Sequence, residues 1–304
     1  MQLFIVGNGF DRGHGLPTTY WNFRTYLENM YPEFLSSFED HYDIYPRMDE
    51  KAKREILWNE LETNLANIDE DTIIDQAASI EMDLESGDVG IEDTLYYFFS
   101  NEYNYIRLLA KLLNRWVRTI RIRDVQSKTT EINNRNDALY ITFNYTAVLQ
   151  TVYKLDAGRI IHIHGSLRQR DGLPVLGHGN KTRIENIQKK RLEAESLFDE
   201  KETSICRVVE DYYERTYKDI SRYTPKLFLL AVKNITEISV VGHSLAGVDI
   251  PYFKLIDEIT KQKAKWKVYY HQNREKIQML NRLIDCGIGA NRIEILSSTD
   301  FYDL

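Results

Sequence analysis

The sequence predicts an α/β fold with a doubly wound parallel sheet, and three features of the chain predict it. Short apolar runs of strand length recur along the chain, and each ends at residues that favour turns. Helical patterns lie between most of these runs, for example over residues 248–263 and 275–286. Small or polar side chains follow the ends of the runs. Such alternation of strands and helices favours parallel strands joined by helical crossovers.

The first predicted strand covers Leu3 to Val6 and runs directly into the loop Gly7-Asn8-Gly9. Each later predicted strand is also an apolar run that ends at turn-forming residues. These strands cover residues 138–142, 159–164, 237–241, 267–271 and 292–296. A helix is expected from about Thr18 to Tyr31, because a proline and two threonines that favour helix starts precede a helical pattern.

The segment after this helix has a different character. Residues 34–122 alternate acidic and apolar side chains, and the apolar ones recur at helical spacing over residues 56–68 and 106–120. Residues 83–90 contain two glycines among acidic side chains, which is typical of a loop. We therefore expect a large helical insertion at residues 33–134.

The remaining sequence forms the expected α/β core, from residues 1–32 and 135–304. Within it, residues 168–225 make a long excursion that contains a highly charged helical run at 181–201. Such a run is usually a solvated helix face, and the sequence leaves open whether the excursion is a lid or a partner surface.

Composition limits the classes of protein to which the chain can belong. Its 304 residues are 43% hydrophobic and 28% charged, which is normal for a soluble globular protein. The net charge of -7 gives no reason to expect broad nucleic-acid binding. No apolar run is long enough to cross a membrane, and because the sequence starts directly with the first strand we expect no leader. Cys206 and Cys286 lack metal-type spacing, so we expect a cytoplasmic protein without disulfides.

Candidate binding residues gather at the predicted strand ends. Glycines after a buried strand let the backbone turn sharply and present N–H groups to a pyrophosphate. In a parallel sheet, ligands bind in the crevice at the carboxyl ends of the strands. The polar residues expected at that edge are Asn8, Asp11, Asn144, His164, His243 and Ser244.

Several motifs in one order resemble the abortive-infection AbiH family of bacterial phage-defence proteins. The resemblance extends from Gly7 to about Phe253. It is carried by the motifs Gly7-Asn-Gly-Phe-Asp-Arg-Gly-His-Gly-Leu-Pro-Thr, Thr142-Phe-Asn-Tyr-Thr, Ile161-His-Ile-His-Gly165, Leu176-Gly-His-Gly and Gly242-His-Ser-Leu, with Asp249 and Tyr252-Phe253. The family is in turn distantly similar to sirtuin-like NAD-binding domains, which implies NAD as substrate or ligand and no metal.

The resemblance also implies roles for individual residues. Asn144 and His164 match the asparagine and histidine of sirtuin-type NAD chemistry. The loop residues Gly7, Asn8 and Gly9 would take the pyrophosphate, and Gly242 and Ser244 would border the adenosine. Gly165, His243 and Asp249 complete the expected binding set, with Asp11 and His14 beside it. The sequence departs from the sirtuin pattern at Thr146, where Asp is usual, and at His243, where Tyr is usual.

Cleavage of the bond between nicotinamide and ribose is the chemistry that this set would support. Its transition state resembles an oxocarbenium ion, so the protein must hold the cofactor and position a water. We expect His164 to be the general base, because a histidine accepts a proton near neutral pH, and Asn144 to position the water or ribose. His162 lies on the same strand face and would support His164 or pack.

Other readings of these residues stay open. Asp11 could bind a ribose hydroxyl or cap a helix, and His14 could face the crevice or fix the loop. Residues 240–247 resemble the nucleophile elbow of a serine hydrolase at Ser244, with only Asp249, Asp257 and His271 after it as triad partners.

Two further alternatives concern the whole site. A non-catalytic sensor would bind NAD or a signalling nucleotide in the same crevice and pass its occupancy to a partner. A metal-dependent nuclease would use His162, His164 and His178, although no carboxylate cluster accompanies them. The sequence leaves open whether the protein forms a homo-oligomer and whether a phage component triggers it.

Overall fold

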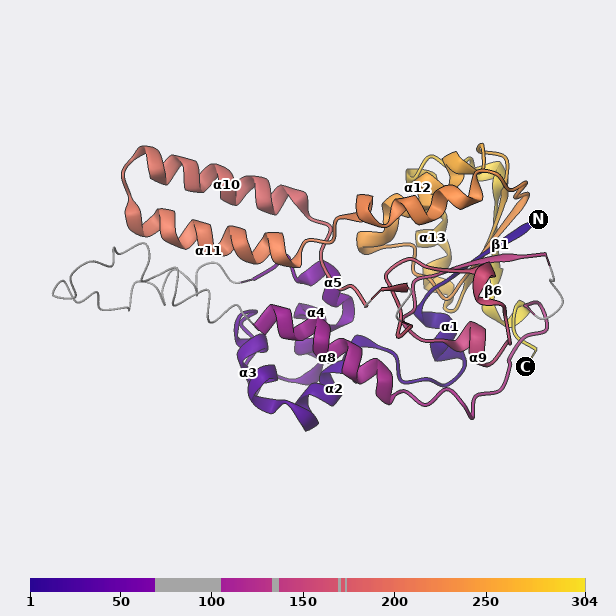
Figure 1. The fold of residues 1–304 in the computed structure, drawn as a ribbon, viewed down its shortest axis with the longest axis horizontal. Helices are drawn as coiled ribbons and strands as arrows, with labels where there is room; N and C mark the ends of the chain where they lie inside the picture. The colour runs from indigo at the N-terminus through magenta and orange to yellow at the C-terminus, as the bar shows by residue number, and fades with distance from the viewer. Residues whose placement is uncertain (69–104, 133–136, 169–170, 173, 304) are drawn as a thin grey trace. The chain divides into compact units, whose positions relative to one another are not determined.

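The fold of the chain comes from a computed structural model (Figure 1). The structure describes residues 1–68, 105–132, 137–168, 171–172 and 174–303. The loop predicted at residues 83–90 lies outside the described residues. None of the described helices is long and apolar enough to cross a lipid bilayer.

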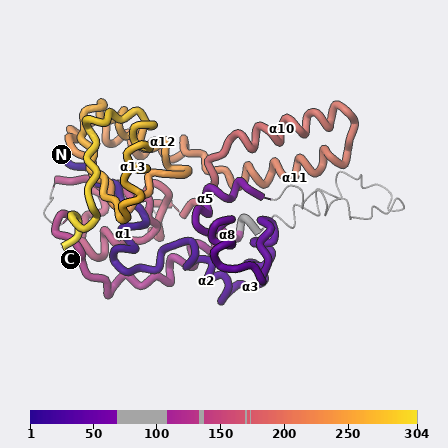
Figure 2. The backbone as a smooth tube through the Cα atoms, turned by 180° about the vertical axis from the view of Figure 1, so that it is seen from behind, coloured from indigo at the N-terminus to yellow at the C-terminus, as the bar shows by residue number. Residues whose placement is uncertain are grey.

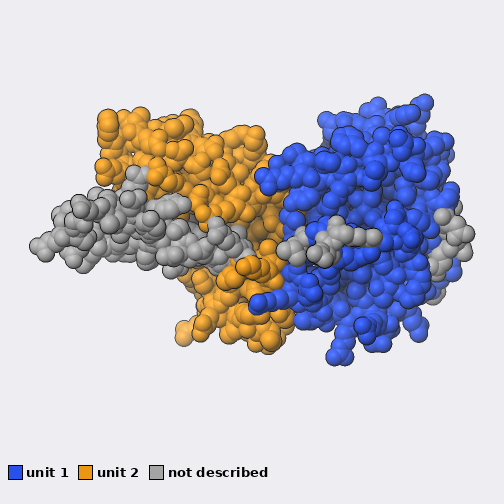
Figure 3. All heavy atoms as spheres, viewed as in Figure 1, with its two compact units in different colours: residues 1–22, 113–175, 219–304 blue, residues 23–112, 176–218 orange. Residues whose placement is uncertain are grey.

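The chain divides into two compact units, shown in different colours in Figure 3. Unit 1 contains residues 1–22, 113–175 and 219–304, and unit 2 contains residues 23–112 and 176–218. Two helices contain a boundary between the units: α2 (Tyr20–Met30) and α8 (Tyr105–Thr119). The predicted limits of the helical insertion and of the charged excursion stay predictions.

Unit 1 is built on a parallel sheet of six strands within the described residues. The strands are β1 (Gln2–Val6), β2 (Leu139–Thr142), β3 (Ile160–His162), β4 (Glu237–Val241), β5 (Lys265–Tyr270) and β6 (Ile293–Ser297). Their order across the sheet is β3-β2-β1-β4-β5-β6, and every neighbouring pair is parallel. The predicted α/β fold with a doubly wound parallel sheet is therefore confirmed.

The central strand β1 is buried along its whole length, as its unbroken apolar run predicts. It pairs with β2 on one side, where Ile5 lies opposite Ile141, and with β4 on the other, where Ile5 lies opposite Val240. Side chains alternate between the two faces of a strand, so Leu3 and Ile5 belong to one core.

Helices cover both faces of this sheet. The core that contains Ile5 also includes Tyr252 and Phe253 of α12 (Ile250–Ile259) and Leu283 of α13 (Asn273–Asp285). On the opposite face, Phe4 stacks on Tyr140 and contacts Phe301, which also contacts Phe10 of α1 (Asn8–Gly13). The remaining α-helix of this unit is α9 (Val148–Thr151). The 3-10 helices that the structure describes in this unit are η2 (Ala157–Arg159), η4 (Ile220–Arg222), η5 (Thr224–Leu230), η6 (Gly247–Asp249), η7 (Ala290–Arg292) and η8 (Ser298–Asp300).

Unit 2 is helical in its described part. Besides parts of α2 and α8 it contains α3 (Pro32–Asp40), α4 (Glu50–Ile56), η1 (Trp58–Glu60), α5 (Leu61–Asn64), α10 (Lys181–Ser196) and α11 (Glu200–Thr216). Helices α10 and α11 lie side by side as an antiparallel hairpin, which Figure 2 shows from behind. The prediction of one helical run over 181–201 is therefore wrong at its C-terminal end, because α10 stops at Ser196 and α11 starts at Glu200.

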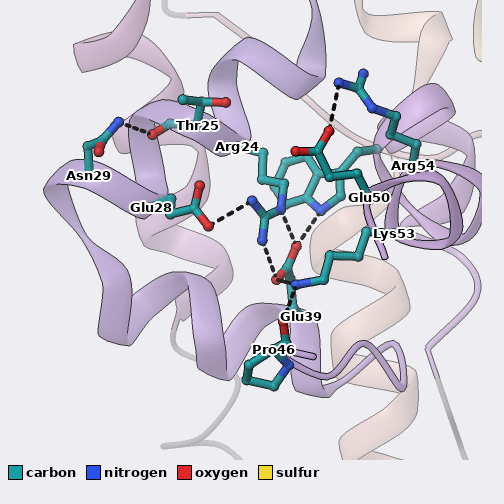
Figure 4. Close-up of polar contacts among 10 residues, drawn as sticks. Arg24, Thr25, Glu28, Asn29, Glu39, Pro46, Glu50, Lys53 and Arg54 are labelled. Carbon is teal, nitrogen blue, oxygen red and sulfur yellow. Dashed lines mark hydrogen bonds and ion pairs between the residues drawn. The ribbon is translucent and has the colours of Figure 1, made fainter. Parts of the chain in front are cut away.

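A buried charged cluster joins the first helices of unit 2 (Figure 4). The Arg24 guanidinium donates two hydrogen bonds to the Glu39 carboxylate, from Nε at 2.7 Å and from Nη2 at 3.0 Å. The indole of Trp58 donates to the same carboxylate at 2.7 Å, and the Lys53 ammonium lies 3.9 Å from it. Because each charge has partners, the cluster fixes α2, α3, α4 and η1 to one another.

Candidate functional site

The candidate site lies in unit 1, at the carboxyl ends of the four strands β1 to β4. Gly7 follows β1 directly, Asn144 comes two residues after β2, His164 two residues after β3, and Gly242 directly after β4. All these strands are parallel, so their carboxyl ends share one edge of the sheet. The strand order reverses between β1 and β4, and this is the point at which doubly wound sheets bind their ligands.

The loops after β1 and β4 pack directly on each other. The Gly7 N–H donates to Val241 O at 3.0 Å, and the Gly9 N–H donates to Gly242 O at 2.7 Å. A Cβ on Gly242 would lie 2.1 Å from the Phe10 nitrogen, and Gly242 has a φ of +66°, so glycine is required there. These two amides are occupied within the protein, so a ligand phosphate at this loop would meet the exposed Asn8.

Asp11 and Asn144 form a buried network behind the loop. The Asn144 amide donates to Gly7 O at 3.0 Å and to Oδ1 of Asp11 at 2.8 Å. The Thr146 hydroxyl donates to Oδ2 of Asp11 at 2.5 Å. Burial raises the pKa of Asp11 to about 7, although the hydrogen bonds from Thr146 and Asn144 oppose this. The network ties α1 to the loop after β2. Thr146 belongs to this network, whereas the sequence marked it only as a departure from the sirtuin pattern.

His14 is fixed on α1 by two hydrogen bonds. Its Nδ1 lies 2.7 Å from the Phe10 carbonyl and must donate to it, so in the neutral ring Nε2 accepts from the Tyr153 hydroxyl at 2.7 Å. Burial lowers the pKa of His14, which keeps the ring neutral. Of the two roles left open for His14, this geometry favours fixing the loop.

His164, Asp249 and His243 come together at the same edge. Nε2 of His164 lies 3.5 Å from Oδ1 of Asp249, and Nε2 of His243 lies 3.4 Å from Oδ2. The Tyr252 hydroxyl is 3.2 Å from Nε2 of His164. Both histidines are buried, whereas the Asp249 side chain is 16% exposed and is the part of this group that solvent reaches. Two of these residues were expected to bind ligand and one to act as base, but their mutual contact was not predicted.

An aromatic side chain forms one wall of this group. The Phe143 ring contacts the rings of His164, His243 and Tyr252 edge to face, with centroids 5.4, 4.6 and 5.6 Å away. Phe143 is the first residue after β2, so the sheet itself places it. An apolar wall next to these rings lowers the local dielectric and strengthens their interaction with Asp249.

The end of β3 is held by a lysine from η5. The Lys226 ammonium donates to His162 O at 2.8 Å and to Ile163 O at 3.1 Å, directly before His164. Burial lowers the pKa of Lys226. His162 points elsewhere, because its ring nitrogens lie 2.7 Å from the Gln150 amide nitrogen and 3.3 Å from Asn144 O. Sequence reasoning missed Lys226, and its one signal was a lysine after Pro225 where the excursion ends.

The turn at Ser244 lacks the contacts of a serine hydrolase. Ser244 is exposed, and its carbonyl accepts a hydrogen bond from Arg282 at 2.7 Å. The nearest histidine in the sequence, His243, is bound to the Leu245 N–H and faces Asp249. No hydrogen bond joins the Ser244 hydroxyl to a histidine in the described part of the chain. Gly165, after His164, has a φ of +79°, a backbone conformation that favours glycine.

His178, the third histidine of the nuclease alternative, belongs to unit 2 and is fully buried. Its Nε2 lies 3.0 Å from Tyr213 O, and its Nδ1 accepts from the Asn180 N–H at 3.1 Å. Burial lowers its pKa to about 4. Both nitrogens are therefore used inside the protein. Among the described residues, no group of three or more His, Cys, Asp or Glu side chains could hold a metal ion.

The family comparison covers all of these residues. A family model described as "Bacteriophage abortive infection AbiH" matches residues 3–270 of the chain. The match spans every candidate site residue, from Gly7 to Asp249. No curated protein sequence matches the chain.

Proposed function

The chain belongs to the bacteriophage abortive-infection AbiH family, and on this premise we propose that it cleaves the nicotinamide–ribose bond of NAD. Loss of NAD would stop the metabolism of an infected cell and with it the growth of the phage. The similarity to sirtuin-like domains that suggested NAD stays a prediction.

The observation that carries the proposal is the strand order β3-β2-β1-β4-β5-β6. This is the order of dinucleotide-binding sheets, in which the ligand lies across the point where the order reverses. In this chain that point is flanked by Asn8, the first residue of α1, and by His243 in the loop after β4. A dinucleotide placed there would have one half toward β2 and β3, where Asn144 and His164 follow the strands.

The reaction needs a base and a positioned water. The water oxygen forms a bond to C1′ of the ribose while the bond from C1′ to the nicotinamide nitrogen breaks. The electron pair of the broken bond leaves with nicotinamide, which becomes neutral. His164 takes the proton that the water releases, and the products are nicotinamide and ADP-ribose. Asn144 acts from a side chain that Gly7 and Asp11 already hold in place. Asp249 is the most exposed member of its group with His164 and His243, with 16% of its side chain exposed.

Chromatography of NAD incubated with the purified protein tests the proposal. We expect release of nicotinamide and ADP-ribose, and a loss of at least about a hundredfold in rate in His164→Ala, which removes the base. Asn144→Ala should also lose turnover. His41→Ala, a change of a partly exposed histidine in unit 2, is the matched control and should keep full activity. Equal turnover in His164→Ala and His41→Ala would exclude His164 as the base.

A non-catalytic nucleotide sensor is the second candidate, and one observation favours it. The Asn144 amide and the Thr146 hydroxyl are both bound to Asp11, so these groups already have a structural role. Calorimetry separates the two candidates. Saturable binding of NAD without any product would support the sensor, whereas product formation would support the hydrolase.

A further inference from the structure

His243 has a fixed direction in the structure. Its Nδ1 lies 2.9 Å from the backbone N–H of Leu245, which has a hydrogen to donate, so Nδ1 is the acceptor. The proton of the neutral ring is then on Nε2, the nitrogen that faces Asp249 at 3.4 Å. The tautomer of His243 is thus set by the backbone two residues later.

The backbone of this turn is held in an uncommon conformation. Leu245 is buried and has a φ of +57°, which is rare for a side chain of its size. Gly242 and Gly247 on either side also have positive φ. A strained turn persists only where its surroundings determine it, and such turns concentrate at functional sites. This turn delivers the Leu245 N–H to His243.

We propose that Asp249 is the positioning carboxylate of His164 and that His243 orients Asp249. We call these three side chains the His243–Asp249–His164 arrangement. The Leu245 N–H fixes His243, the Nε2–H of His243 faces one oxygen of Asp249, and the other oxygen faces Nε2 of His164. The negative charge of Asp249 then stabilises His164 after it has taken a proton. This deepens the proposed function, on which it rests for the work that His164 does.

Other charged and titratable groups of the described residues lie near these rings, including Asp171, whose charge acts on His162 and Lys226. Lys226 lies at the backbone before His164, and Arg282 binds the carbonyl after His243, so both are cations that oppose a charge on the histidines. The Tyr252 hydroxyl and the Tyr223 ring contact His164 and are neutral near pH 7. Asp249 is an anion in contact with both imidazoles.

The test is a titration of the histidine rings by NMR without NAD. The seven histidines are assigned by single substitutions. In Asp249→Asn, which keeps the shape and removes the charge, we expect the pKa of His164 to fall by about one unit or more. The matched control is Glu258→Gln, which removes the same charge from an exposed position on α12 and should leave that pKa unchanged. Equal values in wild type and Asp249→Asn would overturn the proposal.

The role of His243 has its own readouts. The NMR chemical shifts of the ring nitrogens of neutral His243 in the wild type should show the proton on Nε2. A proton on Nδ1 would contradict the His243–Asp249–His164 arrangement. His243→Ala should lower the pKa of His164 by less than Asp249→Asn does. His243→Gln, which restores an N–H near the position of Nε2, should recover part of the loss. A merely structural histidine would give no such recovery.

These measurements separate this inference from the proposed function. The titration needs no turnover. A protein that does not cleave NAD but shows the predicted pKa shifts would refute the proposed NAD cleavage and support the His243–Asp249–His164 arrangement. A protein that cleaves NAD but shows no shift of the His164 pKa in Asp249→Asn would support the proposed NAD cleavage and refute the His243–Asp249–His164 arrangement. If NAD is cleaved, the acid limb of the pH profile should move with the His164 pKa.

Discussion

At the residue scale, Asp11 is the group in the site with the most unusual chemistry. It is 1% exposed, and its carboxyl accepts hydrogen bonds from Asn144 and Thr146. Burial disfavours the charged form more than these bonds favour it, so the pKa rises from 3.8 to about 7. A carboxyl whose pKa lies near neutral pH, at the carboxyl edge of a parallel sheet, is a candidate for acid–base work.

The raised pKa predicts the pH dependence of stability. The folded protein keeps the Asp11 proton to higher pH than the unfolded chain does, so this stability is present below about pH 4 and is lost as the pH rises through 7. Asp11→Asn carries no charge at any pH. We expect its free energy of unfolding, relative to wild type, to rise by roughly 3 kcal/mol between about pH 5 and pH 8.

Urea unfolding of both proteins at the two pH values measures this difference. The comparison with wild type cancels the other titrating groups. These include His162 and His178, whose lowered pKa values act in the opposite direction, since they lose stability as the pH falls. A constant difference between the two proteins across this range would show that Asp11 is ionised in the folded protein.

The sequence predicted which residues lie at the site but not which of them touch. Asn144, His164 and His243 could be placed because each follows an apolar run, and parallel strands share an edge. The contacts of Asp249 with both histidines depend on the path of the chain between β4 and α12, and no local pattern records that path. The pairing of Gly9 with Gly242 is hidden for the same reason.

At the element scale, the buried ion pair of Arg24 and Glu39 should contribute more to stability than an exposed ion pair does. Their side chains are each 6% exposed, and the pair links α2 to α3. Removing one partner leaves an uncompensated buried charge. Glu39→Gln should therefore lower the free energy of unfolding of the protein by about 3 kcal/mol or more.

The matched control for this prediction is Glu55→Gln. Glu55 lies 3.9 Å from Lys51 on α4, but the two side chains are 62% and 85% exposed. Water screens such a pair, so we expect a loss below about 1 kcal/mol. Urea unfolding of the three proteins gives both values. Losses of equal size in the two variants would mean that the Glu39 cluster adds no more than a surface pair.

Strands were easier to predict than short helices. All six strands of the sheet were predicted to within two residues at each end, because buried apolar runs lie between turn residues. Helix α1 was missed, because its sequence Asn8-Gly-Phe-Asp-Arg-Gly13 contains two glycines, which disfavour a helix locally. The packing of the loops after β1 and β4 overrides that preference.

The break between α10 and α11 had a signal that was not used. Asp199 caps α11 by accepting a hydrogen bond from the Glu202 N–H at 2.9 Å, and a helix start of this kind is recognisable from an acidic residue three places after the cap. Phe198 before it has a φ of +59°, which ends the preceding helix. The charged composition of the region hid this boundary.

At the scale of the whole molecule, the family and the strand order bear on function together. The family match spans residues 3–270 and so includes parts of both units. The sheet of unit 1 has the strand order of dinucleotide-binding sheets and brings His164, Asp249 and His243 together at its carboxyl edge. Unit 2 supplies a helical hairpin and a buried charged cluster.

The most direct test of the site is histidine-ring NMR during addition of an NAD analogue. A carbocyclic analogue, in which carbon replaces the ring oxygen of the nicotinamide ribose, cannot form an oxocarbenium ion and so is not consumed. The account predicts saturable shifts of the His164 and His243 signals, with no change at His41 and His178 of unit 2. Unchanged His164 and His243 signals at saturating analogue would contradict a nucleotide site at this edge.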